Sequence, residues 1–165
     1  MTDRDHVDRH VERWLPILPT IDPELEGAVT RMQFLVRHLR EVKEHTLARL
    51  ELQGHEYDTL HVLAGRGGRA APSDLARDLV MAPASVTARV DALVRRGFVH
   101  RIPSTTDRRR VEVELTEAGW TAWRGAMDIR GAEEHRLMTA LAPDERRQLS
   151  DLLRRVVLRA ERPHD

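Results

Sequence analysis

The sequence contains no cysteine, which excludes disulfide bonds, thiol catalysis and cysteine-based oxidation sensing for this chain. It also lacks any apolar run near the roughly 18 residues that a membrane-spanning helix needs. The first ten residues, MTDRDHVDRH, are charged and contain no apolar signal core. We therefore expect a cytoplasmic protein with no membrane partner.

Motifs of the common enzyme classes are missing as well. The sequence contains no G-x-S-x-G nucleophile turn, no phosphate-binding P-loop and no G-x-G-x-x-G dinucleotide fingerprint. The glycines of AGRGGRAAPS do not follow a predicted strand, so they do not indicate a nucleotide site. We expect no enzymatic activity and no cofactor.

Charge is balanced over the whole chain but unevenly distributed along it. The 165 residues include 27 basic and 27 acidic side chains, and 26 of the basic ones are arginine. Between Arg66 and Arg110, however, ten arginines face only four aspartates. A bias toward arginine explains the scarcity of lysine but not this segregation. A neutral protein with one basic segment can still bind a polyanion locally.

Hydrophobic periodicity predicts helices on both sides of the basic segment. A short helix is expected at about residues 3–18, a long one at 23–52 and a third at 55–64. Two further helices start near Thr116 and Pro143. The chain is therefore predicted to be mainly α-helical.

The basic segment itself contains the stretch APSDLARDLVMAPASVTARVDALVRRGFV, which predicts two short helices joined tightly at Met81. Pro83 opens the second helix, where its missing N–H costs nothing, and Gly97 ends it. This is the pattern of a helix-turn-helix. The predicted buried stripe of the second helix consists of Val86, Val90 and Leu93.

Two short β-patterned runs follow directly, at Phe98–Ile102 and Val111–Leu115, with the loop PSTTDRRR between them. A β-hairpin that follows a helix-turn-helix is a wing. The predicted fold is a winged helix-turn-helix with a small β-hairpin and a helical dimerisation region.

Such an arrangement predicts contact with double-stranded DNA. The tip of a wing can enter the minor groove, whose negative potential attracts arginine, and Asp107 is expected to hold the tip by accepting hydrogen bonds. Small side chains on the second helix suit close approach to base edges, and Arg95 and Arg96 at its end would lie near phosphates. The expected DNA-binding residues are Ser73, Ala84, Ser85, Thr87, Ala88, Arg95, Asp107, Arg108, Arg109 and Arg110.

The order of the helices and the motif DRRRVEVELTEAG resemble the MarR family of bacterial winged-helix repressors, over about residues 23–162. The resemblance implies a homodimer that reads a pseudo-palindromic operator with half-sites one helical turn apart. It also implies three parts: N-terminal helices at 1–54 for dimerisation and as a ligand lid, the winged helix at 55–116, and C-terminal dimerisation helices at 117–165. The matching signature residues are Asp107, Arg109, Val111, Leu115, Thr116 and Gly119.

The helix before residue 20 resembles an addition found in the urate-sensing branch of that family, the HucR- and PecS-like repressors. In that branch the ligand site combines a tryptophan, an aspartate and two arginines. The corresponding residues here are Trp14, Asp58, Arg89 and Arg101. The resemblance thus implies a small-molecule effector such as urate or a similar aromatic anion. One departure is Ala88, where members often have asparagine.

The residues give this site some independent support. Arg101 is two residues after Val99 in the predicted strand, so both side chains should lie on the same, inward face. A buried arginine needs a carboxylate partner, and Asp58 is a candidate. Arg89 flanks the predicted buried stripe. An anion bound near these arginines would repel Asp58 and thereby displace the DNA-reading element, provided that it binds the two states unequally.

Three other functions are compatible with parts of the sequence. A MarR-type repressor can respond to a different phenolic or antibiotic ligand. A metal-sensing repressor is the second, although His55 and His61 in the segment HEYDTLH are six residues apart, which does not favour a metal site on one helical face. A helical binding module that does not contact DNA is the third possibility, and salt-sensitive DNA binding distinguishes it.

Overall fold

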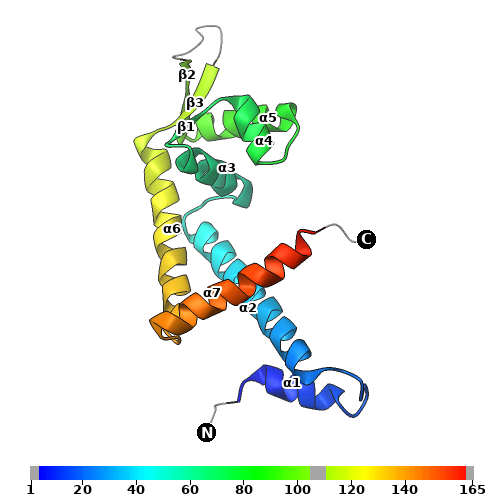
Figure 1. Cartoon of the computed structure of the whole chain (residues 1–165). Helices are drawn as coiled ribbons and strands as arrows, with labels where there is room; N and C mark the ends of the chain where they lie inside the picture. Colours follow the sequence, from blue (N-terminus) through cyan, green and yellow to red (C-terminus); the bar gives the residue numbers. More distant parts are fainter. Residues whose placement is uncertain (1–3, 105–110, 163–165) are drawn as a thin grey trace.

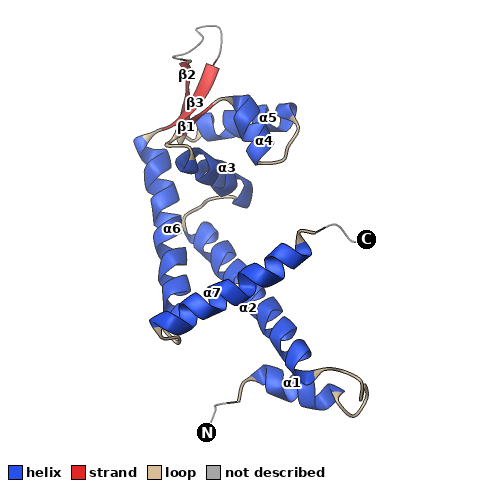
Figure 2. Cartoon of the chain, in the orientation of Figure 1, coloured by secondary structure: helices blue, strands red, loops and turns tan. Residues whose placement is uncertain are grey.

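The computed structural model describes residues 4–104 and 111–162. It is mostly helical with one small antiparallel sheet, which confirms the predicted fold class (Figures 1 and 2). The elements in chain order are α1 (His6–Trp14), α2 (Pro23–Arg49), α3 (Gly54–Gly65), β1 (Arg69–Ala70), α4 (Pro72–Asp78), α5 (Pro83–Arg95), β2 (Val99–Pro103), β3 (Val111–Leu115), α6 (Glu117–Met138) and α7 (Pro143–Ala160).

Local capping determines where the first helices begin and end. The Asp5 carboxylate accepts hydrogen bonds from the backbone of Val7 and Asp8, so α1 starts at His6. The helix predicted at residues 3–18 was too long, because Pro16 and Pro19 follow too closely for the chain to continue as a helix.

The sheet has the strand order β1-β3-β2 and is antiparallel throughout. In the hairpin, Val99 pairs with Leu115 and Arg101 pairs with Val113. The two-residue strand β1, which was not predicted, adds the pair Ala70 and Val113 on the other edge of β3. The sheet therefore attaches the wing to the segment that precedes α4.

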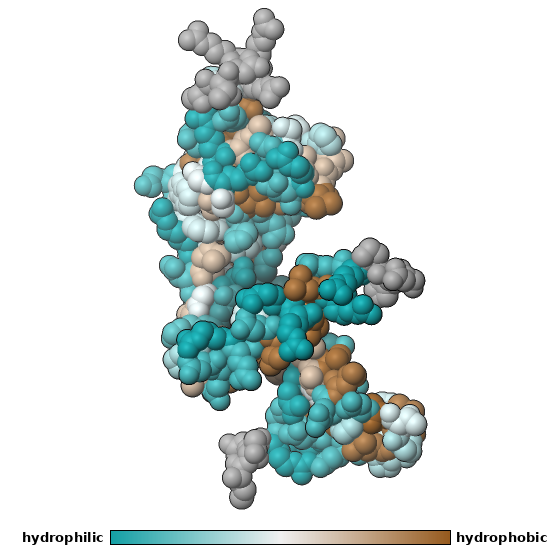
Figure 3. Space-filling model, in the orientation of Figure 1, coloured by the Kyte–Doolittle hydropathy of each residue, from teal (hydrophilic) through white to brown (hydrophobic). Residues whose placement is uncertain are grey.

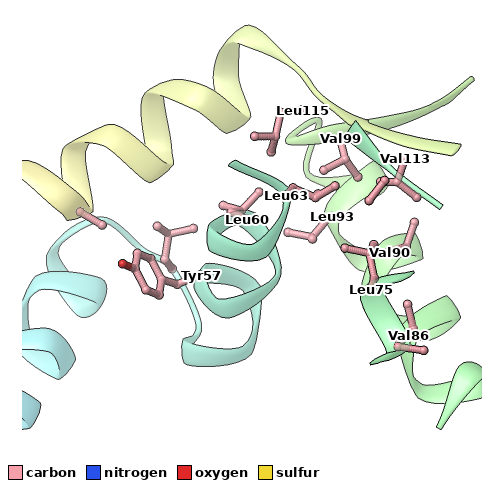
Figure 4. Close-up of a cluster of buried hydrophobic side chains, with 14 of the residues drawn as sticks. Tyr57, Leu60, Leu63, Leu75, Val86, Val90, Leu93, Val99, Val113 and Leu115 are labelled. Atoms are coloured by element: carbon pink, nitrogen blue, oxygen red, sulfur yellow. The ribbon is translucent and has the colours of Figure 1, made fainter. Parts of the chain in front are cut away.

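One hydrophobic core joins α3, α4, α5 and the sheet (Figure 4). The predicted stripe of α5 is confirmed, since Val86, Val90 and Leu93 are at most 1% exposed. Tyr57 on α3 and Val113 on β3 are equally buried. The second helix of the helix-turn-helix and the wing thus belong to one packed body.

The remaining helices extend away from this body (Figure 1). Helices α2 and α6 pack against each other, and the imidazole of His38 lies 2.6 Å from the carboxylate of Glu133 between them. Helix α1 packs on the end of α2 that is distant from the sheet. Helix α7 buries none of its residues within this chain. Across residues 4–104 and 111–162, no helix combines the length and apolar character needed to cross a membrane.

The start of α6 is fixed against the turn between α5 and β2. The Thr116 hydroxyl donates to the carbonyl of Gly97 at 2.6 Å and accepts from the backbone N–H of Gly119 at 3.0 Å. The backbone N–H of Thr116 donates to the carbonyl of Phe98 at 3.0 Å. A Cβ atom at position 119 would overlap that same carbonyl oxygen. The wing, α5 and α6 therefore meet where only glycine fits.

We expect Gly119→Ala to lower the free energy of unfolding by about 3 kcal/mol or more, because a backbone carbonyl cannot move aside as a flexible side chain can. The matched control is Gly131→Ala in the same helix, where an added Cβ meets no atom within 4 Å. This control should gain about 0.5–1 kcal/mol of helix stability. Urea denaturation of both variants checks the difference, and equal effects would contradict the close contact.

Candidate nucleic-acid interface

Helix α5 presents a face of small side chains to solvent. Ala84, Ser85, Thr87 and Ala88 are exposed, while the opposite side of the helix is buried in the core. The Thr87 hydroxyl donates to the carbonyl of Pro83 at 3.2 Å. A helix with such short side chains can approach the floor of a DNA major groove closely.

The two arginines at the end of α5 have different surroundings. Arg95 is exposed and forms no hydrogen bond or ion pair with the part of the chain that the structure describes. Arg96 instead donates to the buried carboxylate of Glu56 and, at 2.8 Å, to the carbonyl of Glu51, and its guanidinium lies over the ring of Phe98. Arg96 was expected near phosphates, but these contacts show that it anchors α5 to α3.

Ion pairs neutralise several other arginines of the basic segment. Arg66 donates to Asp78 at 2.6 Å, and Arg77 donates to Asp74 at 2.5 Å. Ser73, at the start of α4, is exposed beside this cluster. Pairing with aspartates reduces the charge that these arginines offer to a phosphate, so the free cationic groups of the described segment lie on α5.

Three strands meet at the base of the wing in one polar cluster. The Ser104 hydroxyl donates to the carboxylate of Glu112 at 2.5 Å, and Arg69 donates to the same carboxylate and, at 3.2 Å, to the carbonyl of Pro103. The hydrogen bond from Ser104, and then that from Arg69, lowers the pKa of Glu112 below its ordinary value. The cluster joins β1 and β3 to the end of β2. The predicted tip residues Asp107, Arg108, Arg109 and Arg110 lie outside the described residues.

The structure changes the pairing that the sequence suggested for the ligand site. Arg101 donates to Asp91 on α5 at 2.7 Å, and Asp58 accepts from Lys43 on α2 at 2.9 Å, so the expected contact between Arg101 and Asp58 was wrong. Arg101 does lie on the same side of the strand as Val99, but it is exposed. Arg101 pairs with the buried Val113 in the sheet, but its long side chain reaches past the core to the carboxylate of Asp91 on α5.

The four predicted ligand residues fall into two groups. Asp58, Arg89 and Arg101 belong to the winged helix, where Arg89 is half-buried and has no polar partner within the described chain. Trp14 is 39% exposed at the end of α1, which packs on the distant end of α2 (Figure 1). The folded chain alone therefore does not bring Trp14 to the other three.

Two basic residues beside Tyr57, the neighbour of Asp58 in the sequence, were not identified from the sequence. Lys43 lies 5.1 Å from the ring centroid of Tyr57, and Arg130 donates to the hydroxyl of Tyr57 at 2.8 Å. The two cations come from α2 and α6, so no local pattern places them together. The only available signal was that Lys43 is the sole lysine of the sequence.

Known proteins with similar sequences are regulators of the helix-turn-helix type, in agreement with the arrangement of α4, α5 and the hairpin. Residues 50–110 match the sequence model of the MarR family. The HTH-type transcriptional regulator PecS of Dickeya dadantii (strain 3937) is 28% identical over 151 residues, which cover 88% of this chain and 89% of PecS.

Solved structures show the same fold. The crystal structure of RV1404 from Mycobacterium tuberculosis has a TM-score of 0.72 at 24% identity, covering 87% of this chain and 99% of RV1404. The S. aureus MepR–DNA complex has a TM-score of 0.63 at 19% identity, covering 78% of this chain and 96% of MepR.

We expect Glu112→Gln to weaken the wing base at neutral pH but not at low pH. The folded-state pKa of Glu112 lies below its ordinary value of 4.5, so the carboxylate contributes its full stabilisation above that pH. The contribution is lost as the pH falls through the lowered value. The difference in urea midpoint between the original chain and Glu112→Gln, followed from pH 7 to pH 3, should therefore shrink in acid. A difference that is constant with pH would argue against a charged Glu112.

Proposed function

We propose that this chain, a MarR-family winged-helix transcriptional regulator, is a homodimeric repressor that releases its operator when it binds a small aromatic anion such as urate. The observation that carries the proposal is the exposed face of α5, held in one packed body with the wing base. In this proposal residues 55–116 contact DNA, residues 1–54 serve dimerisation and form a ligand lid, and residues 117–165 serve dimerisation.

The proposed DNA contacts divide by chemistry. The small residues of α5 approach base edges, and Arg95 meets a phosphate because it has no acidic partner in the described chain. The arginines of the wing tip extend this contact to the neighbouring groove. The full set is Ser73, Ala84, Ser85, Thr87, Ala88, Arg95, Asp107, Arg108, Arg109 and Arg110.

Homodimer formation is supported by the apolar faces of α2 and α7. Leu35 on α2 and Leu152 and Val156 on α7 are 39%, 47% and 54% exposed. They line one groove of about 1190 Å³ between the two helices. A monomer rarely leaves so much aliphatic surface in water. A second copy related by a two-fold axis would cover the same surface on both chains.

Support for the ligand comes from two arginines, Arg89 on α5 and Arg101 on β2. Arg89 has no polar partner among the described residues, so it can attract an anion without breaking an existing contact. An anion that also engages Arg101 would compete with Asp91, whose 2.7 Å hydrogen bond joins the wing to α5. Such competition would change the relation between the two DNA-reading elements. The ligand must therefore favour the conformation that does not fit DNA. An alternative to urate is a phenolic ligand that binds at the same arginines.

The DNA-binding part of the proposal is tested by the salt dependence of affinity. We expect Arg95→Ala to weaken binding to every bound sequence and to reduce the slope of log affinity against log salt by about two, because the proposed homodimer loses one phosphate contact in each half-site. Arg147→Ala is the control, since Arg147 is also exposed and lies on α7, a helix outside the packed body that contains α5. Equal slopes for Arg95→Ala and the original chain would exclude Arg95 from the interface.

The ligand part is tested by release of DNA in a gel shift titrated with urate. The original chain should release its operator. Because one chain does not bring Trp14 to the two arginines, the proposal needs Trp14 of the second copy to complete the site, and Trp14→Phe should then need about two- to tenfold more urate. Trp123→Phe is the matched control and should behave like the original chain. Release by a phenolic anion but not by urate would replace urate by that anion as the proposed ligand. An unchanged urate requirement in Trp14→Phe would remove Trp14 from the site.

A further inference from the structure

The turn between α4 and α5 contains a valine, Val80, in a backbone conformation that is unfavourable for valine. Val80 has a φ of 52°, in the left-handed region, where a β-branched side chain is strained. The residue is 91% exposed, so burial of its side chain within the chain does not offset this strain. Glycine would adopt this turn without strain. Packing therefore gives no reason for a valine here.

Val80 belongs to an uncharged surface that leads into α5. From Val80 to Ala84 the chain has no polar side chain, and all of these residues except the half-buried Met81 are exposed. The surface continues along the helix through the exposed Thr87 and Ala88. Hydrophobic residues gather at this edge of the winged helix in the space-filling view (Figure 3).

The same face offers few hydrogen-bond donors to a base. It has no arginine, lysine, asparagine or glutamine before Arg89, and these are the side chains that form paired hydrogen bonds with guanine or adenine. Its side-chain donors are the hydroxyls of Ser85 and Thr87, and that of Thr87 donates to the carbonyl of Pro83. Methyl groups, by contrast, are plentiful. In the major groove their complement is the C5-methyl group of thymine.

We infer that the side chain of Val80 and the methyl groups of Ala84, Thr87 and Ala88 select thymine, through its C5-methyl group, in each operator half-site. The inference rests on the proposed function, because it concerns how α5 reads the DNA. It predicts specificity from apolar contacts more than from paired hydrogen bonds. Burial of one methyl group corresponds to about a fourfold change in affinity.

The test replaces single thymines by uracil, which removes the C5-methyl group and leaves base pairing unchanged. The purified chain first selects duplexes from a random library, and each thymine of the selected site is then replaced in turn. We expect about fourfold weaker binding for at least one thymine in each half-site, and no change for thymines outside the protected region. Equal affinity for thymine and uracil at every position overturns the inference and leaves DNA binding intact. A chain that selects no duplex at low salt contradicts the proposed function itself.

The variant Val80→Gly tests whether Val80 makes the contact with the thymine methyl group. Glycine relieves the left-handed strain, so the melting temperature should not fall, and the variant should still bind the selected duplex. Its preference for thymine over uracil should disappear at one position in each half-site. If the preference persists unchanged at every position, Val80 does not contact thymine and the inference fails.

Discussion

The position of α5 relative to the wing depends on one core that water does not reach. Leu93 from α5, Leu60 from α3 and Val113 from β3 are each 0% exposed and belong to the same hydrophobic cluster. Because both elements are built on these side chains, a relative shift of α5 and the wing opens a cavity, so only a ligand that binds the shifted state better can bring the shift about. The grooves of a duplex lie at defined distances, so a rigid relation between α5 and the wing suits a reader of DNA.

The arginines of the basic segment fall into two groups, of which the first forms ion pairs at the border of this core. Arg96 pairs with Glu56, Arg69 with Glu112 and Arg101 with Asp91, and these contacts join neighbouring elements. Arg89 and Arg95 have no such partner among residues 4–104 and 111–162. The local excess of arginine is therefore only partly available to phosphates. The pair of Arg101 and Asp91 is also the contact through which an anion could act on the wing.

Local patterns were sufficient to predict the winged helix. The buried stripe of α5, its start at Pro83 and its end before Gly97 follow from periodicity and from the backbone preferences of proline and glycine. The two-residue strand β1 is too short to show alternation and was missed. The partners of Arg101, Arg96 and Asp58 were not predicted correctly, because they come from elements brought together only by tertiary packing.

The sequence predicted which residues belong to the candidate ligand site but not how these residues are arranged in space. Asp58, Arg89 and Arg101 lie in the winged helix, but the sequence gives no measure of how far α1 carries Trp14 from them. A long α2 separates the two groups, and the relation of α1 to a second copy is not a local property. For the same reason the exposed apolar faces of α2 and α7 could not be interpreted from local patterns, and in our proposal a second copy covers them.

Footprinting of a bound duplex with hydroxyl radicals tests most directly whether a symmetric pair of winged helices reads DNA. We expect two protected stretches, related by two-fold symmetry, with centres one helical turn apart or a whole number of turns apart. A single protected stretch would contradict the proposed dimer on DNA. The absence of protection at low salt would contradict DNA recognition by α5 and the wing.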